Sequence, residues 1–197
     1  KYFDNILASG HGSVLEHASF SFAIEGVTRV FTAEMNRHRA GWAISEGSFR
    51  FIRFDKDIPY WVPDSIRGTD FLGPPNPDVH PDLEHCLSFA DSEADKLEVR
   101  KQLSRESFDR VFRFVEKEYG FLLNVWDMDE EDKNFSYKKK VTSCLRRIVP
   151  LGVSTGGVWT GNVRALRHVL AMRCSPAAEE EIAHVFTRVA DRIVAEQ

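Results

Sequence analysis

The 197-residue chain is long enough for one domain with a sizeable core, and its content of 43% hydrophobic and 28% charged residues is that of an ordinary soluble protein. The formal charge of -4 at pH 7 argues against a general nucleic-acid-binding protein, because binding to phosphate backbones requires a surplus of lysine and arginine. We therefore expect no nucleic-acid partner, and any anionic ligand must be met by a local cluster of cations.

The cysteine content and the lack of a recognisable targeting segment indicate an intracellular protein. The three cysteines, Cys86, Cys144 and Cys174, form no CxxC pair, and their odd number does not suit a disulfide framework. No apolar run approaches the roughly 20 residues of a membrane span. The start of the sequence, KYFDNILASG, lacks the basic and apolar regions of a signal peptide. The sequence therefore predicts a cytoplasmic protein with reduced cysteines and no membrane contact.

The first regular elements are expected between residues 19 and 39. Alternation in SFSFAIEGVTRVF, which puts Phe20, Phe22 and Ile24 on one side, predicts a strand that leads into a helix reaching Met35. The helix is expected to end at the sequence RHR, residues 37–39.

A proline-rich insertion at about residues 55–100 is predicted within a single domain that spans residues 1–197. Its prolines are too dense for regular helix or central strand, and they are Pro59, Pro63, Pro74, Pro75, Pro77 and Pro81. From about Ser88 to Tyr119 the pattern becomes helical. Apolar residues expected on one face there are Phe108, Val111, Phe112 and Val115. The acidic sequence WDMDEEDK that follows is predicted to be a solvated turn.

The last part of the chain, from Tyr137, contains RRIVPLGVSTGG and predicts two helices. The second is expected to begin with Ser175 as its N-cap, Pro176 at its first position and the acidic residues 179–181 in its first turns. Its predicted buried stripe consists of Ile182, Val185, Phe186, Val189 and Ile193.

Common nucleotide-binding, zinc-protease and hydrolase motifs are absent from the sequence: GxxxxGK[ST], GxGxxG, HExxH and GxSxG. A metal site at His80, His85 and Cys86 is a weak alternative, because no second ligand pair has zinc spacing. Cys144 is a weak candidate nucleophile beside two arginines, since neighbouring cations activate thiols. Packing is the more common role of such a cysteine.

Several arginines lie beside small or polar residues, and arginine binds phosphate or a carbonyl-bearing ring in a bidentate manner. Glu46, Gly47 and Ser48 would add backbone N–H donors and a hydroxyl, as in a phosphate-binding nest. The residues alone thus predict a phosphorylated small ligand. The arginines are Arg37, Arg39, Arg50, Arg146, Arg164 and Arg173.

Six ordered blocks of the sequence carry a family resemblance. They are HGSVLEH (11–17), GVTRVFTAEMNRHR (26–39), SEGSFRF (45–51), RRIVPLG (146–152), WTGNVRAL (159–166) and MRCSPAAEEEI (172–182). Together they resemble the flavin-dependent thymidylate synthases. The resemblance implies a mixed α/β (α+β) subunit with an antiparallel sheet and long helices, assembled as a homotetramer whose active sites are shared between subunits.

The activity that this resemblance implies is methylation of dUMP at C5 to dTMP. FAD would be the cofactor, methylenetetrahydrofolate the carbon donor and NADPH the reductant, and the scheme needs neither a metal nor a nucleophilic cysteine. Catalytic roles are implied for His11 and for Arg173, which would favour ionisation of the pyrimidine at N3. The implied flavin-binding residues are Ser13, Glu16, Arg37, His38, Arg39, Glu46, Asn162, Arg164 and His168. The implied nucleotide-binding residues are Glu34, Arg37, Glu46, Gly47, Ser48, Phe49, Arg50, Arg146 and Arg173.

The sequence also departs from the family pattern. The loop between RHR and Ser48 is one residue longer, Glu34 stands where a glutamine is common, and Phe51 replaces a tyrosine. A carboxylate near a phosphate or a uracil carbonyl repels it unless the carboxylate is protonated or paired with an arginine. The alternatives are therefore C5 alkylation of another pyrimidine nucleotide, such as UMP, or a non-catalytic nucleotide-binding paralogue.

The family also places a strand and a helix ahead of HGSVLEH, close to which this sequence starts. We expect either that this segment lies outside the sequence or that the chain is a shortened member of the family.

Overall fold

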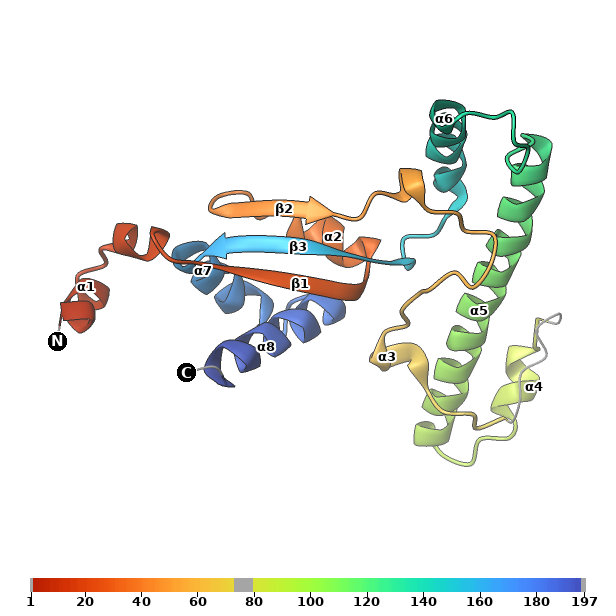
Figure 1. Ribbon diagram of the computed structural model, residues 1–197. Coiled ribbons are helices and arrows are strands. Elements are labelled where there is room, and N and C mark those ends of the chain that lie inside the picture. The colour runs from red at the N-terminus through yellow and green to blue at the C-terminus, as the bar shows by residue number, and fades with distance from the viewer. Residues whose placement is uncertain (1, 73–79, 196–197) are drawn as a thin grey trace. The chain divides into compact units, whose positions relative to one another are not determined.

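The computed structural model describes residues 2–72 and 80–195, which form two compact units (Figure 1). The first unit joins the two ends of the chain, residues 2–47 and 154–195, and the second consists of residues 48–72 and 80–153. The single-domain organisation inferred from the sequence stays a prediction. Three of the prolines in the predicted insertion, at positions 74, 75 and 77, lie outside the described residues.

The first unit is built on a three-stranded antiparallel sheet in the order β1-β3-β2. Trp159 of β3 pairs with Phe22 of β1 and with Ile44 of β2, so the central strand joins segments from both ends of the chain. The elements of this unit are α1 (Tyr2–Ala8), the 3-10 helix η1 (Gly12–Glu16), β1 (Ser19–Thr28), α2 (Arg29–Met35), β2 (Trp42–Glu46), β3 (Ser154–Asn162), α7 (Val163–Arg173) and α8 (Glu180–Ala195). The strand-to-helix transition predicted for residues 19–35 is confirmed.

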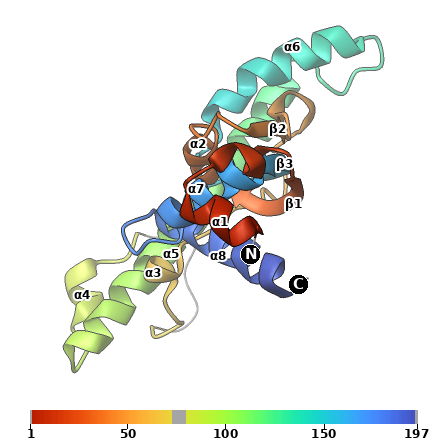
Figure 2. The same cartoon turned by 90° about the vertical axis from the view of Figure 1, so that its left-hand side faces the viewer.

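Helices α2, α7 and α8 cover one face of this sheet, as two views at right angles show (Figure 1 and Figure 2). Phe31 of α2 packs edge-on against Trp159, with ring centroids 5.6 Å apart, and both side chains are fully buried. Burial of such large aromatic side chains gives this small unit a substantial part of its hydrophobic stabilisation. The core also contains Val27, Met35, Leu166, Val169, Ile182, Phe186 and Val189.

Helix α8 begins later than the sequence predicts. Its first residue is Glu180, and the Glu179 carboxylate accepts hydrogen bonds from the backbone N–H groups of Glu181 (3.0 Å) and Ile182 (3.1 Å). Ser175 instead starts a turn, in which its carbonyl oxygen accepts from the N–H group of Ala178 (3.0 Å). The prediction of Ser175 as N-cap was therefore wrong, because a charged acceptor four residues later satisfies the free N–H groups of the helix. The predicted buried stripe of this helix is confirmed.

Glu181 links α8 to the junction between β1 and α2. Its carboxylate accepts a hydrogen bond from the backbone N–H of Thr28 at 2.6 Å and another from the Thr28 hydroxyl. Burial raises the pKa of Glu181 above its ordinary value, although the hydrogen bonds from Thr28 act in the opposite direction. This buried contact joins residues 153 positions apart and fixes the start of α2.

The second unit is organised around α5 (Glu93–Val125), a helix of 33 residues that begins at the N-cap Ser92. Its other elements are η2 (Phe49–Phe51), α3 (Asp64–Arg67), α4 (Leu83–Leu87), α6 (Phe135–Leu145) and η3 (Arg146–Ile148). The long helix is confirmed, as is the acidic turn after it. Of the predicted stripe, Phe108, Phe112 and Val115 pack into the core, but Val111 is 47% exposed. Its position at the edge of that face leaves it in solvent.

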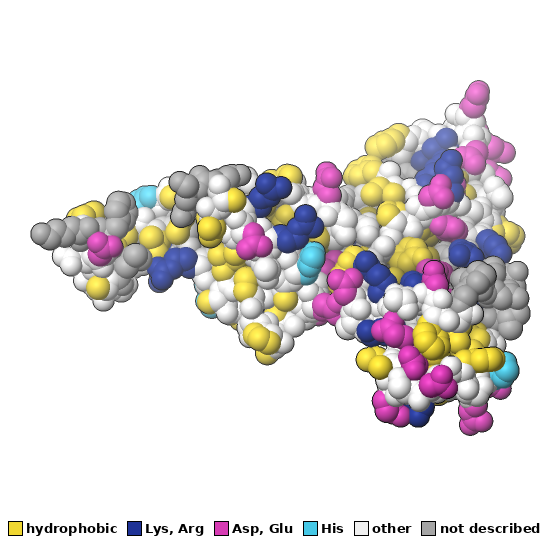
Figure 3. All heavy atoms as spheres, turned by 90° about the horizontal axis from the view of Figure 1, so that it is seen from below, with side chains coloured by type: hydrophobic (Ala, Val, Ile, Leu, Met, Phe, Trp, Pro, Cys, Tyr) yellow, Lys and Arg dark blue, Asp and Glu magenta, His cyan; other side chains and the backbone are white. Residues whose placement is uncertain are grey.

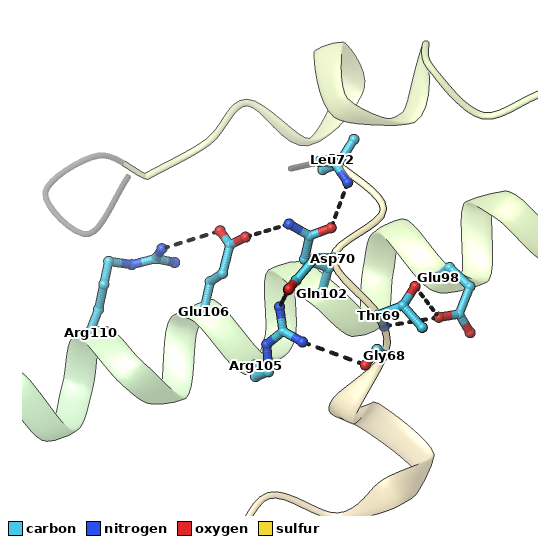
Figure 4. A network of polar contacts seen from close by, with 9 residues as sticks. All are labelled: Gly68, Thr69, Asp70, Leu72, Glu98, Gln102, Arg105, Glu106 and Arg110. Carbon is cyan, nitrogen blue, oxygen red and sulfur yellow. Dashed lines mark hydrogen bonds and ion pairs between the residues drawn. The ribbon is translucent and has the colours of Figure 1, made fainter. Parts of the chain in front are cut away.

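A network of polar side chains fastens residues 68–72 to α5 (Figure 4). Gln102 is buried, accepts a hydrogen bond from the backbone N–H of Leu72 (2.7 Å) and donates one to Glu106 (2.8 Å). Arg105 pairs with Asp70 close by. The network satisfies polar groups that would otherwise be costly to bury.

Charged side chains of both signs are interspersed on the face that Figure 3 shows. Among the described residues, we find no helix that combines the length and the apolar character needed to cross a membrane.

Candidate functional site

Packing of α2 determines which of its side chains are free to meet a ligand. The Thr28 hydroxyl oxygen caps this helix by accepting hydrogen bonds from two backbone N–H groups of the first turn, at 3.1 and 3.4 Å. Phe31 and Met35 are buried in the core, whereas Glu34 is partly exposed. The helix reaches Met35, as predicted, but it ends there rather than at the RHR residues 37–39, which lie in the turn after it.

Arg173, the last residue of α7, contacts this part of the chain. Its Nη1 donates a hydrogen bond to Oε2 of Glu34 at 2.8 Å, and its Nε donates to Nε2 of His38 at 3.0 Å. The Arg173 side chain is only 15% exposed, whereas that of Arg37, which lies 4.0 Å from the Glu34 carboxylate, is 75% exposed. The fold thus brings together three predicted site residues from two distant segments.

The surroundings of His38 disfavour its protonated form. Burial lowers the pKa of His38 from its ordinary value of 6.5, and the nearby charges of Arg173 and His168 lower it further. The Glu34 carboxylate acts in the opposite direction, more weakly. The ring of His168 lies nearly perpendicular to that of His38, with centroids 6.3 Å apart. At neutral pH, His38 is therefore an uncharged hydrogen-bond acceptor.

Glu46, predicted to contact both flavin and nucleotide, is paired within the first unit. Its carboxylate forms an ion pair with Arg29, and its Oε2 accepts a hydrogen bond from Nδ2 of Asn36 at 3.1 Å. Arg29 also donates through Nη2 to the carbonyl oxygen of Gly47 at 2.8 Å. Arg29 and Asn36 are not among the residues that the sequence predicts. Pairing of β2 with β3 fixes the end of β2, where Glu46 lies opposite Gly157.

A further ion pair joins η1 to the start of α7. Nη1 of Arg164 donates to Oε1 of Glu16 at 2.5 Å, and both side chains are exposed. A Cβ atom at Gly12 would lie 3.0 Å from Nε of Arg164, so a glycine suits this close approach. Asn162 is the N-cap of α7, since its Oδ1 accepts a hydrogen bond from the backbone N–H of Ala165 at 2.8 Å. This oxygen has a structural role, whichever ligand the site takes.

The other predicted residues of the first unit are exposed, namely His11, Ser13, Arg39 and His168. His11 directly precedes η1, and its side chain makes no capping hydrogen bond. After Arg39 the chain reverses at Gly41, whose φ of 77° is unfavourable for other residues. The carbonyl oxygen of Gly41 accepts a hydrogen bond from the backbone N–H of Asn162 at 3.0 Å, which holds the RHR turn close to the start of α7.

The predicted phosphate-binding residues belong to the second unit. The Ser48 hydroxyl accepts a hydrogen bond from the backbone N–H of Arg50 at 3.5 Å, at the start of η2. The carbonyl oxygen of Arg50 accepts from the Thr142 hydroxyl at 2.7 Å, which ties η2 to α6 and leaves the guanidinium exposed. Arg146 follows α6 and is partly buried. The Phe49 side chain packs in the core, so its ring is not available to a ligand.

The donor set of the first unit fits a phosphate-bearing cofactor. Arg37, Arg39 and Arg164 present exposed guanidinium groups, which bind phosphate oxygens in a bidentate manner. Within residues 2–72 and 80–195, no three His, Cys, Asp or Glu side chains lie close enough together to hold a metal ion. Cys86 is buried, whereas Cys144 and Cys174 are exposed, and all three are free thiols.

Known proteins are similar to this chain over nearly its whole length. The family model described as "Thymidylate synthase complementing protein" (Thy1) matches residues 1–196. Over 181 residues, the chain is 32% identical to the flavin-dependent thymidylate synthase of Mycobacterium avium (strain 104) and 31% identical to that of Mycobacterium tuberculosis (strain ATCC 25618 / H37Rv). Each alignment covers 92% of this chain and 60% of the relative. The chain therefore spans about 60% of the length of these curated relatives.

Two solved structures have a similar fold, each at 20% sequence identity. One is Thymidylate Synthase X (ThyX) from Helicobacter pylori with FAD and dUMP, with a TM-score of 0.51 over 92% of this chain and 70% of that one. The other is the UMP/dUMP methylase PolB from Streptomyces cacaoi bound with 5-Br UMP, with a TM-score of 0.64 over 97% and 74%. The predicted mixed α/β class with a small antiparallel sheet and long helices is confirmed.

Proposed function

The chain belongs to the thymidylate synthase complementing protein family, and we propose that it methylates a pyrimidine nucleotide at C5 with FAD as cofactor. The preferred substrate is dUMP, with methylenetetrahydrofolate as the one-carbon donor and NADPH as the reductant. The reaction then balances as follows. The methylene carbon leaves the folate and replaces the C5 hydrogen, which departs as a proton, and a hydride from NADPH completes the methyl group. The products are dTMP, tetrahydrofolate and NADP+, with one proton taken up overall because the two folate nitrogens released from the carbon are protonated.

The single observation that carries this proposal is the fixed position of Arg173 beside the RHR turn. A guanidinium has five N–H groups, and Glu34 and His38 each accept a hydrogen bond from a different nitrogen of Arg173. We propose that the remaining N–H groups meet the pyrimidine where negative charge develops on N3 and the adjacent carbonyl. A positioned cation stabilises such charge, and this makes C5 a better nucleophile.

Exposed cations of the first unit support the proposed flavin site. Arg37, Arg39 and Arg164 would bind the phosphates of FAD, and the neutral His38 and the exposed His168 would lie beside the flavin without binding its phosphates. When bound, FAD supplies the hydride transfer that side chains cannot perform. His11, Ser13 and Glu16 would line the flavin and folate side of the site, and Asn162 would face it from the start of α7. Glu46, held by Arg29 and Asn36, would position the adjoining backbone.

We assign the nucleotide phosphate to Ser48, Arg50 and Arg146. The Ser48 hydroxyl and the guanidinium of Arg50 are exposed. The backbone N–H of Gly47 donates to the carbonyl oxygen of Gly156 at 2.8 Å, so this glycine would hold the turn before Ser48 rather than offer a free donor. Arginine retains its charge at every physiological pH, so it suits a phosphate whose own charge varies near neutrality.

A second candidate substrate is UMP. The departure at position 34, where Glu34 stands in place of a common glutamine, is the reason to test this alternative. The ion pair of Glu34 with Arg173 removes much of the repulsion expected between a free carboxylate and a uracil carbonyl. The structurally similar PolB protein is itself described as a UMP/dUMP methylase.

We also propose a homotetramer with active sites shared between subunits, because the exposed arginines would then be enclosed around their ligands. Light scattering at micromolar concentration tests this assembly. A monomeric mass would contradict the shared site without bearing on which nucleotide the chain binds.

The activity is tested with purified protein reconstituted with FAD. We expect the absorbance bands of a bound oxidised flavin, and conversion of dUMP to dTMP only when methylenetetrahydrofolate and NADPH are both present. Parallel reactions with UMP distinguish the two substrates. A flavin-bound protein that modifies neither nucleotide would instead identify a non-catalytic nucleotide-binding member of the family.

A further inference from the structure

The hydrogen bond between Arg173 and His38 defines the protonation state of the histidine. Nε of Arg173 lies 3.0 Å from Nε2 of His38. Because the guanidinium keeps all its protons and has no acceptor, Arg173 must be the donor. Nε2 of His38 therefore carries a lone pair, and the ring is neutral with its proton on Nδ1.

Glu34 provides the second attachment point for the same guanidinium. It lies four residues before His38, and its Oε2 accepts from Nη1 of Arg173 at 2.8 Å. Two acceptors on different nitrogens of a planar group fix its plane as well as its position. The 15% exposure of the arginine side chain further restricts alternative rotamers.

The charged groups around His38 oppose a proton on its ring. From α7, Arg173 and His168 face it, and both lower its pKa. From α2, only Glu34 raises it, and this carboxylate is shared with Arg173 and, at 4.0 Å, with Arg37. A protonated His38 would lose its acceptor nitrogen and place a second cation against Arg173.

We infer that His38 is a positioning residue, which holds the Arg173 guanidinium in one orientation only while its ring is neutral and releases it on protonation. This role differs from the flavin contact that the family resemblance implies. It rests on the proposed function only in naming the pyrimidine as the group that the oriented guanidinium meets.

Nuclear magnetic resonance of the protein without nucleotide tests the inference directly. Histidine labelled at Cε1 reports the titration of His38, and the Nε–H signal of Arg173 reports the hydrogen bond. We expect His38 to titrate below its usual range, and the Arg173 signal to shift with the same midpoint. Arg173→Gln should raise the His38 midpoint. Arg167→Gln, which removes the same charge from an exposed position of α7, should leave it unchanged.

His38→Gln separates positioning from simple packing. The glutamine side chain can accept a hydrogen bond but does not titrate, so the Arg173 Nε–H signal should persist to acidic pH. An Arg173 signal that ignores His38 protonation, or a His38 midpoint that Arg173→Gln leaves unchanged, would overturn the inference. If the coupling is present but the protein methylates no nucleotide, then the positioning stands and the proposed function fails.

Discussion

Arg173 and Glu34 lie 139 residues apart in the sequence, yet Nη1 of the arginine is 2.8 Å from Oε2 of the glutamate. This ion pair resolves the conflict that the sequence presents at position 34, where a free carboxylate would repel a nucleotide. Since the Arg173 side chain is largely buried and that of Glu34 is 27% exposed, the pair is screened less than a surface salt bridge. It also fixes the residue to which we assign the chemistry.

Replacing Arg173 tests that assignment. We expect Arg173→Ala to retain its flavin but to lose nucleotide methylation by about two to three powers of ten, since removing a positioned electrostatic group costs about 3 to 4 kcal/mol in the transition state. Arg173→Lys should restore activity only partly, because an ammonium cannot present a planar fork. Flavin reduction by NADPH, measured separately from methyl transfer, should survive.

The matched control is Arg167→Ala, an exposed change on the same helix. Methyl transfer at near the wild-type rate in Arg173→Ala would contradict the assignment. Arg173 would then act only as a cation at the end of α7, where it stabilises the helix by about 0.3 to 1 kcal/mol.

Glu181 gives a pH dependence of stability with a defined sign. Burial raises its pKa in the folded protein above the ordinary value of 4.5, so the folded state binds the proton more tightly than the unfolded state. The resulting stabilisation is full below pH 4.5 and is lost as the pH rises through the folded-state pKa. Glu181→Gln removes this titration, so its stability relative to wild type should increase as the pH rises from 4.5 toward neutrality.

Urea unfolding of wild type and Glu181→Gln at a series of pH values measures this difference. Glu118→Gln, an exposed change on α5, serves as the control. A wild type that gains stability over Glu181→Gln with rising pH would show that the hydrogen bonds from Thr28 outweigh burial.

Local sequence pattern predicts β1 and the helices α2 and α8 of the first unit, but neither β2 nor the central strand β3, and little of the site. The strand and helix of residues 19–35 and the stripe of α8 follow from periodicity, because each element buries one face. The start of α8 depends on which of two acceptors caps it, and Glu181 is held in place by Thr28, 153 residues away. No local pattern contains that information.

In the candidate site, too, the sequence predicts the types of residue but not the contacts between them. Arginine clusters alone predict an anionic ligand, and the family resemblance is needed to select Arg173 and His38 as members of one site. Neither source reveals that these two side chains share a hydrogen bond, or that Arg29 pairs with Glu46. Those contacts arise when β3 pairs with both β1 and β2 and so brings the ends of the chain together.

Alanine variants of two glycines with similar φ angles distinguish the effect of backbone strain from that of steric contact. Gly26 has a φ of 72°, and no atom lies within 4 Å of the place that a Cβ would take there. At Gly41, with a φ of 77°, a Cβ would lie 2.8 Å from Cβ of Ala165. Both alanine variants carry the strain of a left-handed residue, about 1 to 3 kcal/mol. Gly41→Ala should lose at least about 1 kcal/mol more, since it also forces the RHR turn away from α7.

Thermal and urea unfolding of the two variants give the comparison. Equal losses would mean that the turn relaxes without resistance. In that case, the RHR residues would not be held as tightly as their contacts with α7 indicate.

The most direct test of the central claim is the release of tritium from dUMP labelled at C5. Methylation at C5 must expel the hydrogen there, so tritium should enter water in a ratio of about one per dTMP formed, as one bond to C5 replaces the other. Release should require methylenetetrahydrofolate and reduced flavin, and it should persist when Cys144 and Cys174 are replaced by serine. Undiminished tritium in the nucleotide, in a flavin-bound protein supplied with all components, would contradict the assignment of C5 methylation of dUMP to this chain.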